Sequence, residues 1–421
     1  MSNLAILGGR VLDPGQGLDA RTGVWIDEGI ISRVGPAAAE TTQDAAQAGQ
    51  DAAQEPARRQ IDATGLIVTP GVVDLHTHLY PGVSHYGIEP DTYCLGRGVT
   101  TAVDAGSAGA QTFPGMRRYV IEKSQTRVMA FLNIAVQGMI TNLVGELEDL
   151  RWASGAQAIA RAREHPDLIV GIKVRLGYQM TGNDPAPAFN LAMDAADALG
   201  LPLMVHVIDM RPGLSWLVPQ LRRGDIVTHC FHGNDGGILD AGGRLAPGVM
   251  RARERGVLFD IGHGAGSFSY RVARAAISQG FAPDTISSDL HAHNIGGPAY
   301  DQATTLSKLL HAGMELPDVI RATTSTPARA IGREHSIGAL APARDGDLSV
   351  FELRSGRWAL PDAAGATEVV ERLLVPRMAV LAGHVRDLDP PAGEVRSGGA
   401  GDAAGEVVAG GGGDAAGRAP R

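Results

Sequence analysis

Two histidines, separated by one residue, occur in the stretch GVVDLHTHLYPG, residues 71–82, directly after a run that contains Val, Val and Leu. Because side chains alternate along a strand, His76 and His78 point to the same side of it. Two imidazoles at the end of a buried strand are costly to leave without polar partners. A bare His-x-His pair is also typical of satisfied structural or surface histidines, so the rest of the chain must decide between the two interpretations.

Further polar side chains end other apolar, strand-like runs of the chain. The most informative are Lys173 in GIKVRL, His206 in LMVHVI, His229 in DIVTHCF and Asp289 in DTISSDLH, whereas Asp104, Asn133 and His263 are less diagnostic. Imidazole and carboxylate ligands together favour zinc or a neighbouring divalent metal. If these strand ends meet in the fold, the sequence predicts a metal site there.

Lys173 is the odd member of this set. An ammonium group cannot ligate a metal, and it would repel a cation. A desolvated, neutral amine that reacts with carbon dioxide would instead become a carbamate, an anion with two oxygens that can bridge two metals. The alternative at this stage is a salt bridge made from the strand.

Eight strand-like runs, with helical segments between them, must position these residues. They span residues 66–76, 99–106, 127–134, 168–176, 201–208, 225–231, 256–262 and 284–291, and helical patterns include 186–200, 270–280 and 301–313. Alternating strands and helices indicate a parallel sheet. The span 66–330 fits the roughly 250 residues of a closed (β/α)8 TIM barrel, whose active site lies at the carboxyl ends of its strands. An open doubly wound sheet is the competitor, but no glycine-rich phosphate fingerprint follows the first strand.

The flanks of this α/β barrel contain short strands broken by Gly and Pro turns. Neither flank alone has enough strands for a stable sheet. We expect residues 1–65 and 332–388 to form one composite β-sandwich domain, with the barrel of residues 66–331 inserted between its halves. Residues 36–58 are expected to be a loop insertion. The Gly/Ala-rich tail, 389–421, cannot bury enough apolar surface to offset its ordering entropy and is expected to be disordered.

Composition limits the functional classes. The 421 residues are 44% hydrophobic and 20% charged, as in a soluble globular protein. A net charge of −9 does not favour binding to nucleic acid or to an anionic membrane. Two cysteines, Cys94 and Cys230, predict no disulfide framework and suit a reducing compartment. With no signal peptide or long apolar run evident, we expect a cytoplasmic protein with a small-molecule substrate. Acidic barrels of this size commonly form homo-oligomers, but no interface is readable.

In combination, the motifs resemble the amidohydrolase superfamily of binuclear metallohydrolases. They are PGVVDLHTH, GIKVRL, MVHV, THCFHG and SSDLH, and with FDIGHGAGSF they look most like its amidohydrolase/deacetylase branch, which is related to dihydroorotases. The resemblance covers nearly all of residues 1–386 and stops at the Gly/Ala tail. It implies hydrolysis of an amide or ester bond with two divalent metal ions, expected to be Zn²⁺.

The resemblance also implies a role for each motif residue. His76 and His78 would bind the more buried metal, Lys173 as its CO2-derived carbamate would bridge both metals, His206 and His229 would bind the more exposed metal, and Asp289 would complete the first site. Asp289 would also take the proton of the attacking water. The family tends to have Asn where His232 stands, so we interpret His232 as a loop histidine.

Substrate recognition is predicted from two positions. Arg175 lies two residues after Lys173 and faces the same side of the strand, so its guanidinium could hold a substrate carboxylate bidentately. An ion pair with a neighbouring loop acid is an equally open interpretation. His263 lies among glycines that permit close approach of a ligand. Further rim candidates are His85, Tyr86, His291, His293 and Asn294.

The main hypothesis is a metal-dependent deacylase of small N-acyl or O-acyl carboxylates. Cyclic amide hydrolysis, as in dihydroorotases or hydantoinases, would use the same metals and differ only in loop residues. A single-metal deaminase does not need a bridging lysine. A non-catalytic scaffold on this fold would typically have lost ligands, whereas this chain retains all six.

Overall fold

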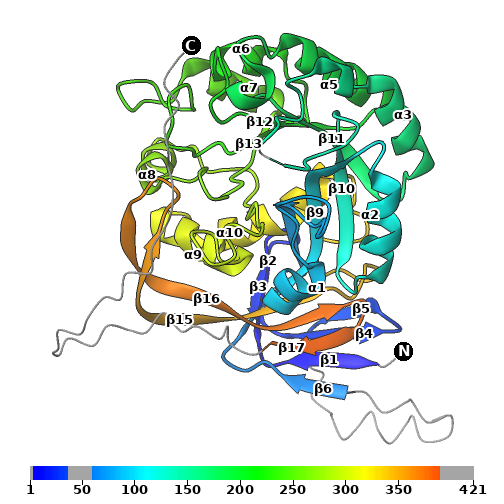
Figure 1. Ribbon diagram of the computed structural model, residues 1–421. Helices are drawn as coiled ribbons and strands as arrows, with labels where there is room; N and C mark the ends of the chain where they lie inside the picture. The colour runs from blue at the N-terminus through cyan, green and yellow to red at the C-terminus, as the bar shows by residue number, and fades with distance from the viewer. Residues whose placement is uncertain (1–2, 37–58, 142, 389–421) are drawn as a thin grey trace, which may run out of the picture.

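The computed structural model describes residues 3–36, 59–141 and 143–388 (Figure 1). The predicted disordered tail, 389–421, lies outside the described residues, as does all of the predicted insertion 36–58 except Pro36.

A seven-stranded parallel sheet curls to form most of the predicted barrel. Its strands are β8 (Val72–Thr77), β9 (Val99–Gly109), β10 (Arg127–Asn133), β11 (Ile169–Arg175), β12 (Leu203–His206), β13 (Ile226–Thr228) and β14 (Leu258–Phe259), paired in chain order. The predicted eighth strand, 284–291, is not a regular strand. Single parallel bridges join Thr285 to Asp260 beyond β14 and Leu290 to Thr77 of β8, so this segment closes the barrel.

Helices cover the outside of the barrel (Figure 1). They include α2 (Phe113–Tyr119), α3 (Gly155–Glu164), α5 (Ala186–Leu199), α7 (Pro247–Arg255), α8 (Tyr270–Ser278), α9 (Gln302–Ala312) and α10 (Leu316–Thr323). The Asp301 side chain accepts a hydrogen bond from the Thr304 backbone N–H and caps α9. Gly313, with a φ of 117°, ends the same helix. The predicted helices at 186–200, 270–280 and 301–313 are thus present.

The two ends of the chain form the predicted sandwich. A six-stranded sheet has the order β17-β16-β15-β7-β2-β3, and a four-stranded sheet has the order β5-β4-β1-β6. Their bounds are β1 (Leu4–Leu7), β2 (Arg10–Asp13), β3 (Leu18–Arg21), β4 (Gly23–Asp27), β5 (Ile30–Gly35), β6 (Arg59–Asp62), β7 (Ile67–Pro70), β15 (Leu348–Pro361), β16 (Thr367–Leu381) and β17 (His384–Asp387). Buried residues of both sheets, such as Ile6, Val24, Val68 and Val350, share one apolar core.

The predicted first barrel strand, 66–76, is divided at Gly71. Its first half, β7, pairs with β15 and β2 in the sandwich, and only the second half, β8, enters the barrel. A Cβ at Gly71 would lie 2.3 Å from Oγ1 of Thr100, so the chain can pass here only without a side chain.

The β15–β16 hairpin extends far beyond the sandwich and reaches the barrel next to α8 (Figure 1). At its tip, the Ala363 backbone N–H donates to the Phe268 carbonyl at 2.9 Å, and Asp362 Oδ2 accepts from the Tyr270 N–H at 3.0 Å. The sandwich domain, to which this hairpin belongs, therefore supplies part of the barrel rim. Within the described ranges, no helix combines the length and apolar character needed to cross a membrane.

Candidate metal centre

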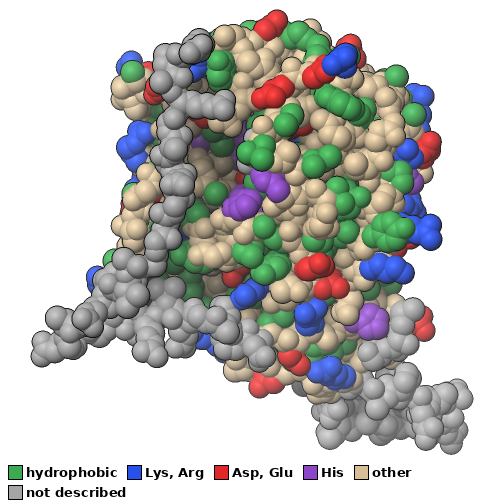
Figure 2. Space-filling view, viewed as in Figure 1, with side chains coloured by type: hydrophobic (Ala, Val, Ile, Leu, Met, Phe, Trp, Pro, Cys, Tyr) green, Lys and Arg blue, Asp and Glu red, His purple; other side chains and the backbone are tan. Residues whose placement is uncertain are grey.

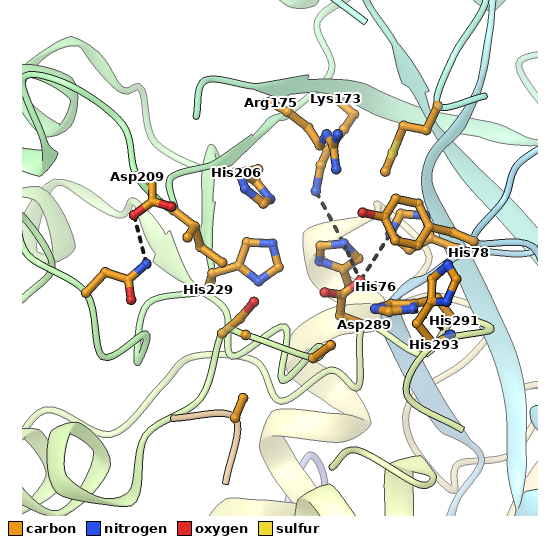
Figure 3. Close-up of a pocket in the computed structure, with 18 residues that line it drawn as sticks. His76, His78, Lys173, Arg175, His206, Asp209, His229, Asp289, His291 and His293 are labelled. Carbon is orange, nitrogen blue, oxygen red and sulfur yellow. Dashed lines mark hydrogen bonds and ion pairs between the residues drawn. The ribbon is translucent and has the colours of Figure 1, made fainter. Parts of the chain in front are cut away.

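A cavity of about 560 Å³ opens at the carboxyl ends of the barrel strands (Figure 3). All six predicted metal ligands line it, namely His76, His78, Lys173, His206, His229 and Asp289. The rim candidates Tyr86, His291 and His293 line it too. On the face shown in Figure 2, histidine side chains reach the surface beside a hollow.

Hydrogen bonds fix which nitrogen of two histidines faces the cavity. Nδ1 of His76 lies 2.9 Å from Oγ1 of Thr228, and that hydroxyl donates its own hydrogen to Oδ2 of Asp260 at 2.7 Å. His76 Nδ1 must therefore be the donor to Thr228, which leaves a lone pair on Nε2. Nδ1 of His229 donates to the Gly262 carbonyl at 2.8 Å, so Nε2 of His229 also carries a lone pair.

These lone pairs converge on a buried carboxylate. One ligand atom each of His76, His229 and Asp289 lies within 4.8 Å of the others. Oδ1 of Asp289 is 3.3 Å from Nε2 of His76 and 3.1 Å from Nε2 of His78. In the part of the chain that the structure describes, this buried oxygen has no hydrogen-bond donor. A buried carboxylate oxygen that has no donor and faces imidazole nitrogens fits a bound cation, and imidazole with carboxylate suits a divalent transition metal.

Burial keeps the histidines neutral at physiological pH. It lowers the pKa of His78 and of His229 to about 3, and the pKa values of His76 and His206 lie well below the ordinary value. Neutral imidazole is the form that ligates a metal. Burial also raises the pKa of Asp289.

Lys173 is fully buried, with Nζ 3.4 Å from Nε2 of His76 and 3.4 Å from Sδ of Met204. Burial lowers the pKa of this amine to about 7. Among the described residues no carboxylate forms an ion pair with Lys173, so the salt bridge considered from the sequence is not found. Near neutral pH, the Lys173 side chain is therefore an uncharged amine in a substantial fraction of the molecules.

Arg175 forms the ion pair that the sequence left open. Its Nε lies 2.7 Å from Oε1 of Glu146 and its Nη2 3.0 Å from Oε2, and both side chains are buried. The guanidinium nevertheless lines the cavity. A guanidinium has five N–H donors, so this pair leaves some of them for a ligand.

His263, the other predicted substrate contact, is not among the residues that line the cavity. Its side chain turns toward α9, where Nε2 lies 2.9 Å from Nζ of Lys308, and it stacks on Phe268. His232 is also away from the cavity lining. It is a buried loop histidine, 2% exposed, whose Nδ1 accepts from the Asn234 backbone N–H at 3.2 Å.

Three functional contacts were missed from the sequence. Thr228 and Asp260 orient the His76 ring, and Glu146 pairs with Arg175. Asp260 could have been recognised from the sequence, since it is an acidic residue inside the apolar run GVLFDIG. Glu146 could not have been recognised in this way, because it lies in a segment without apolar periodicity.

The chain is similar to several known proteins. A model described as the amidohydrolase family matches residues 269–386. A deacetylase of Agrobacterium fabrum is 39% identical over 332 residues, which span 78% of this chain and 81% of that protein. The crystal structure of a dihydroorotase superimposes with a TM-score of 0.82 and 34% identity, covering 93% of this chain and 100% of that one. The crystal structure of an adenine deaminase also gives a TM-score of 0.82, with 29% identity and coverage of 92% and 100%.

Proposed function

The chain belongs to the amidohydrolase superfamily, hydrolases that act on carbon–nitrogen bonds, and we propose that it is a binuclear metal-dependent deacetylase of small acylated carboxylates. The deacetylase relative supports this activity because its similarity extends over 81% of its length. We further propose a reducing, cytoplasmic compartment, to which Cys94 and Cys230, both buried and unpaired, are suited.

One observation carries the proposal, namely that ring nitrogens of His76 and His78 converge on Oδ1 of Asp289, a buried oxygen without a hydrogen-bond donor among the described residues. The proposed ligands of two divalent ions are His76, His78, His206, His229, Asp289 and the carbamate of Lys173. The carbamate would form when the neutral Nζ attacks carbon dioxide and releases a proton, which the lowered pKa of Lys173 favours. The ligand types favour zinc. Bound divalent ions would lower the pKa of water and polarise a carbonyl oxygen.

The chain's own residues would orient the reactants and move the proton. The Asp289 carboxylate would accept a proton from the attacking water and return it to the leaving nitrogen or oxygen as the acyl bond breaks. Thr228 with Asp260, and the Gly262 carbonyl, would hold the His76 and His229 rings in the required tautomers. Remaining N–H groups of Arg175 would donate to the substrate carboxylate.

The direct test is an assay of zinc-loaded enzyme on N-acetyl amino acids and O-acetyl hydroxy acids. We expect release of acetate from at least one of them. If the enzyme holds its metals and turns over no acyl compound, the proposed activity is wrong.

Cyclic amide hydrolysis is the second candidate, because the dihydroorotase structure is 34% identical and is covered in full. The same proposed metal site would serve ring opening. Assays on dihydroorotate and hydantoins, run with the acetyl compounds, decide between the two. Ring opening faster than deacetylation would favour this second function.

A further inference from the structure

Lysine is scarce in this chain, which has three lysines and 34 arginines. Lys123 is exposed, and Lys173 belongs to the candidate metal centre. Lys308, on α9, is fully buried and lies outside the cavity lining. A buried lysine in a chain that otherwise uses arginine needs an explanation, because burial of a charged group is costly unless every donor has a partner.

Three acceptors surround the side-chain nitrogen of Lys308. Its Nζ lies 2.9 Å from Nε2 of His263 and donates to the carbonyls of Pro298 at 2.6 Å and Pro361 at 2.7 Å. Nδ1 of His263 lies 3.0 Å from the Gly264 carbonyl, so Nδ1 carries the hydrogen and Nε2 accepts from the lysine. One compact side-chain nitrogen thus joins three segments, a geometry that the forked arginine side chain does not offer.

Each of these segments carries residues of the cavity wall. Ala265, Gly266 and Ser267 follow His263, and Ala363 follows Pro361 at the tip of the β15–β16 hairpin. Pro298 follows the turn at residues 292–296, and His291 and His293, which lie just before and within this turn, also line the cavity. Lys308 therefore joins one element of the sandwich domain to two loops of the barrel.

The same loop contacts two of the candidate metal ligands. Gly262, just before His263, accepts the hydrogen bond from His229. Gly264, just after it, has a φ of 55°, and a Cβ there would lie 2.4 Å from Oδ2 of Asp289. A shift of His263 would consequently move the wall of the cavity next to the proposed proton acceptor.

We propose that Lys308 is a positioning residue that holds the hairpin tip and the two rim loops in one arrangement and so shapes the substrate side of the cavity. Its kinetic effect rests on the proposed hydrolase function, whereas its effect on loop order does not. It acts through His263, Pro298 and Pro361 and does not touch the reacting atoms.

The test compares Lys308→Met with the matched control Lys123→Met. Methionine keeps the apolar stem and removes all three donors. We expect Lys308→Met to retain its metal, to raise KM at least about tenfold with a smaller change in kcat, and to lose preference among acyl groups of different size, because small misplacements near a site have large kinetic effects. Lys123→Met should match the wild type. A lowered melting temperature with unchanged KM, kcat and acyl preference would mean that Lys308 only stabilises the fold, which would overturn the proposal.

Amide hydrogen exchange provides a readout that does not depend on activity. Residues 263–269 and 361–366 should exchange faster in Lys308→Met, while β9 and β11 should not change. Unchanged exchange in both segments would refute the positioning role even if no substrate has been found. If Lys308→Met does not fold, His263→Phe keeps the stacking on Phe268 and removes one acceptor, and it should accelerate exchange in 263–269. Unchanged exchange in this variant would likewise contradict the proposal.

Discussion

At the scale of single residues, Asp289 has an unusual backbone conformation. It has a φ of 47°, a left-handed conformation that is uncommon for a residue with a side chain. Its Oδ1 faces the nitrogens of His76 and His78, and the backbone of Gly264 lies against its Oδ2. Strained backbone of this kind persists only where the surroundings hold it, and it concentrates at functional sites.

Replacing Asp289 by Asn separates its shape from its basicity. Asn keeps a carbonyl oxygen but cannot take up the proton, so turnover should fall by about 10²–10⁴-fold, the usual contribution of a general acid–base group. Metal content and melting temperature should change little when they are measured on the same preparation. A variant that holds metal and turns over at nearly the wild-type rate would show that the base lies elsewhere.

Thr228 offers a test of ring orientation at the metal centre. Thr228→Val removes the hydroxyl between Asp260 and His76 without changing the side-chain shape. Metal affinity should fall by roughly 10–100-fold, as for other groups that orient a ligand. Thr228→Ser retains the hydroxyl and serves as the control. Equal zinc affinity of all three proteins in a competition titration would argue against a role of the hydrogen bonds from His76 through Thr228 to Asp260 in metal binding.

That the candidate ligands line one cavity was predictable, because a strand alternates its side chains and parallel strands share one rim. His76, Lys173 and Asp289 could be read from that rule together with the family resemblance. Side chains in the rim loops do not alternate in this regular way. The direction of the His263 side chain and the partner of Arg175 therefore could not be predicted from the sequence.

At the scale of elements, the hairpin and the eighth segment of the barrel decide the shape of the site. Eight apolar runs predicted eight strands, yet residues 284–291 make only single bridges on either side. Serines in this segment bond to buried acids instead, as Ser287 does to Asp260 and Ser288 to Asp74. Apolar character could not reveal this use of polar side chains, nor the assignment of β7 to the sandwich, because both halves of 66–76 are equally buried.

Enlarging Ala363 tests whether the hairpin tip forms a wall of the cavity. Ala363→Leu should raise KM for large acyl groups by about 10-fold or more relative to acetyl, since a few methylenes in a pocket discriminate by about 10–200-fold. Ala366→Leu, on an exposed residue of the same tip, is the matched control. Identical acyl preferences in both variants would place the tip outside the substrate's reach.

At the scale of the whole molecule, the buried histidines make the metal-free fold sensitive to acid. The pKa values of His78 and His229 are lowered to about 3, and that of His291 to about 4, against about 6.5 in an unfolded chain. Between these values the unfolded state binds more protons than the folded state. The contribution of these histidines to stability is therefore full above pH 6.5 and decreases as the pH falls toward 3.

Melting curves of the metal-free protein between pH 7 and 4 should show this loss. His291→Gln should make the decline shallower, because one buried site no longer favours the protonated unfolded chain. His335→Gln changes a side chain that is 92% exposed and should leave the slope as in the wild type. A melting temperature that does not vary over this range would contradict the burial of neutral imidazoles.

The central claim is a two-metal site bridged by a carbamate on Lys173, and one measurement tests it most directly. Protein loaded with zinc in ¹³C-bicarbonate should give one carbamate carbonyl signal and bind about two metal ions per chain. Lys173→Ala should lose the signal and most of the metal, and a short carboxylic acid should restore part of the activity, while Lys308→Met keeps the signal. Two bound metals and full activity in Lys173→Ala, without any added acid, would contradict the claim.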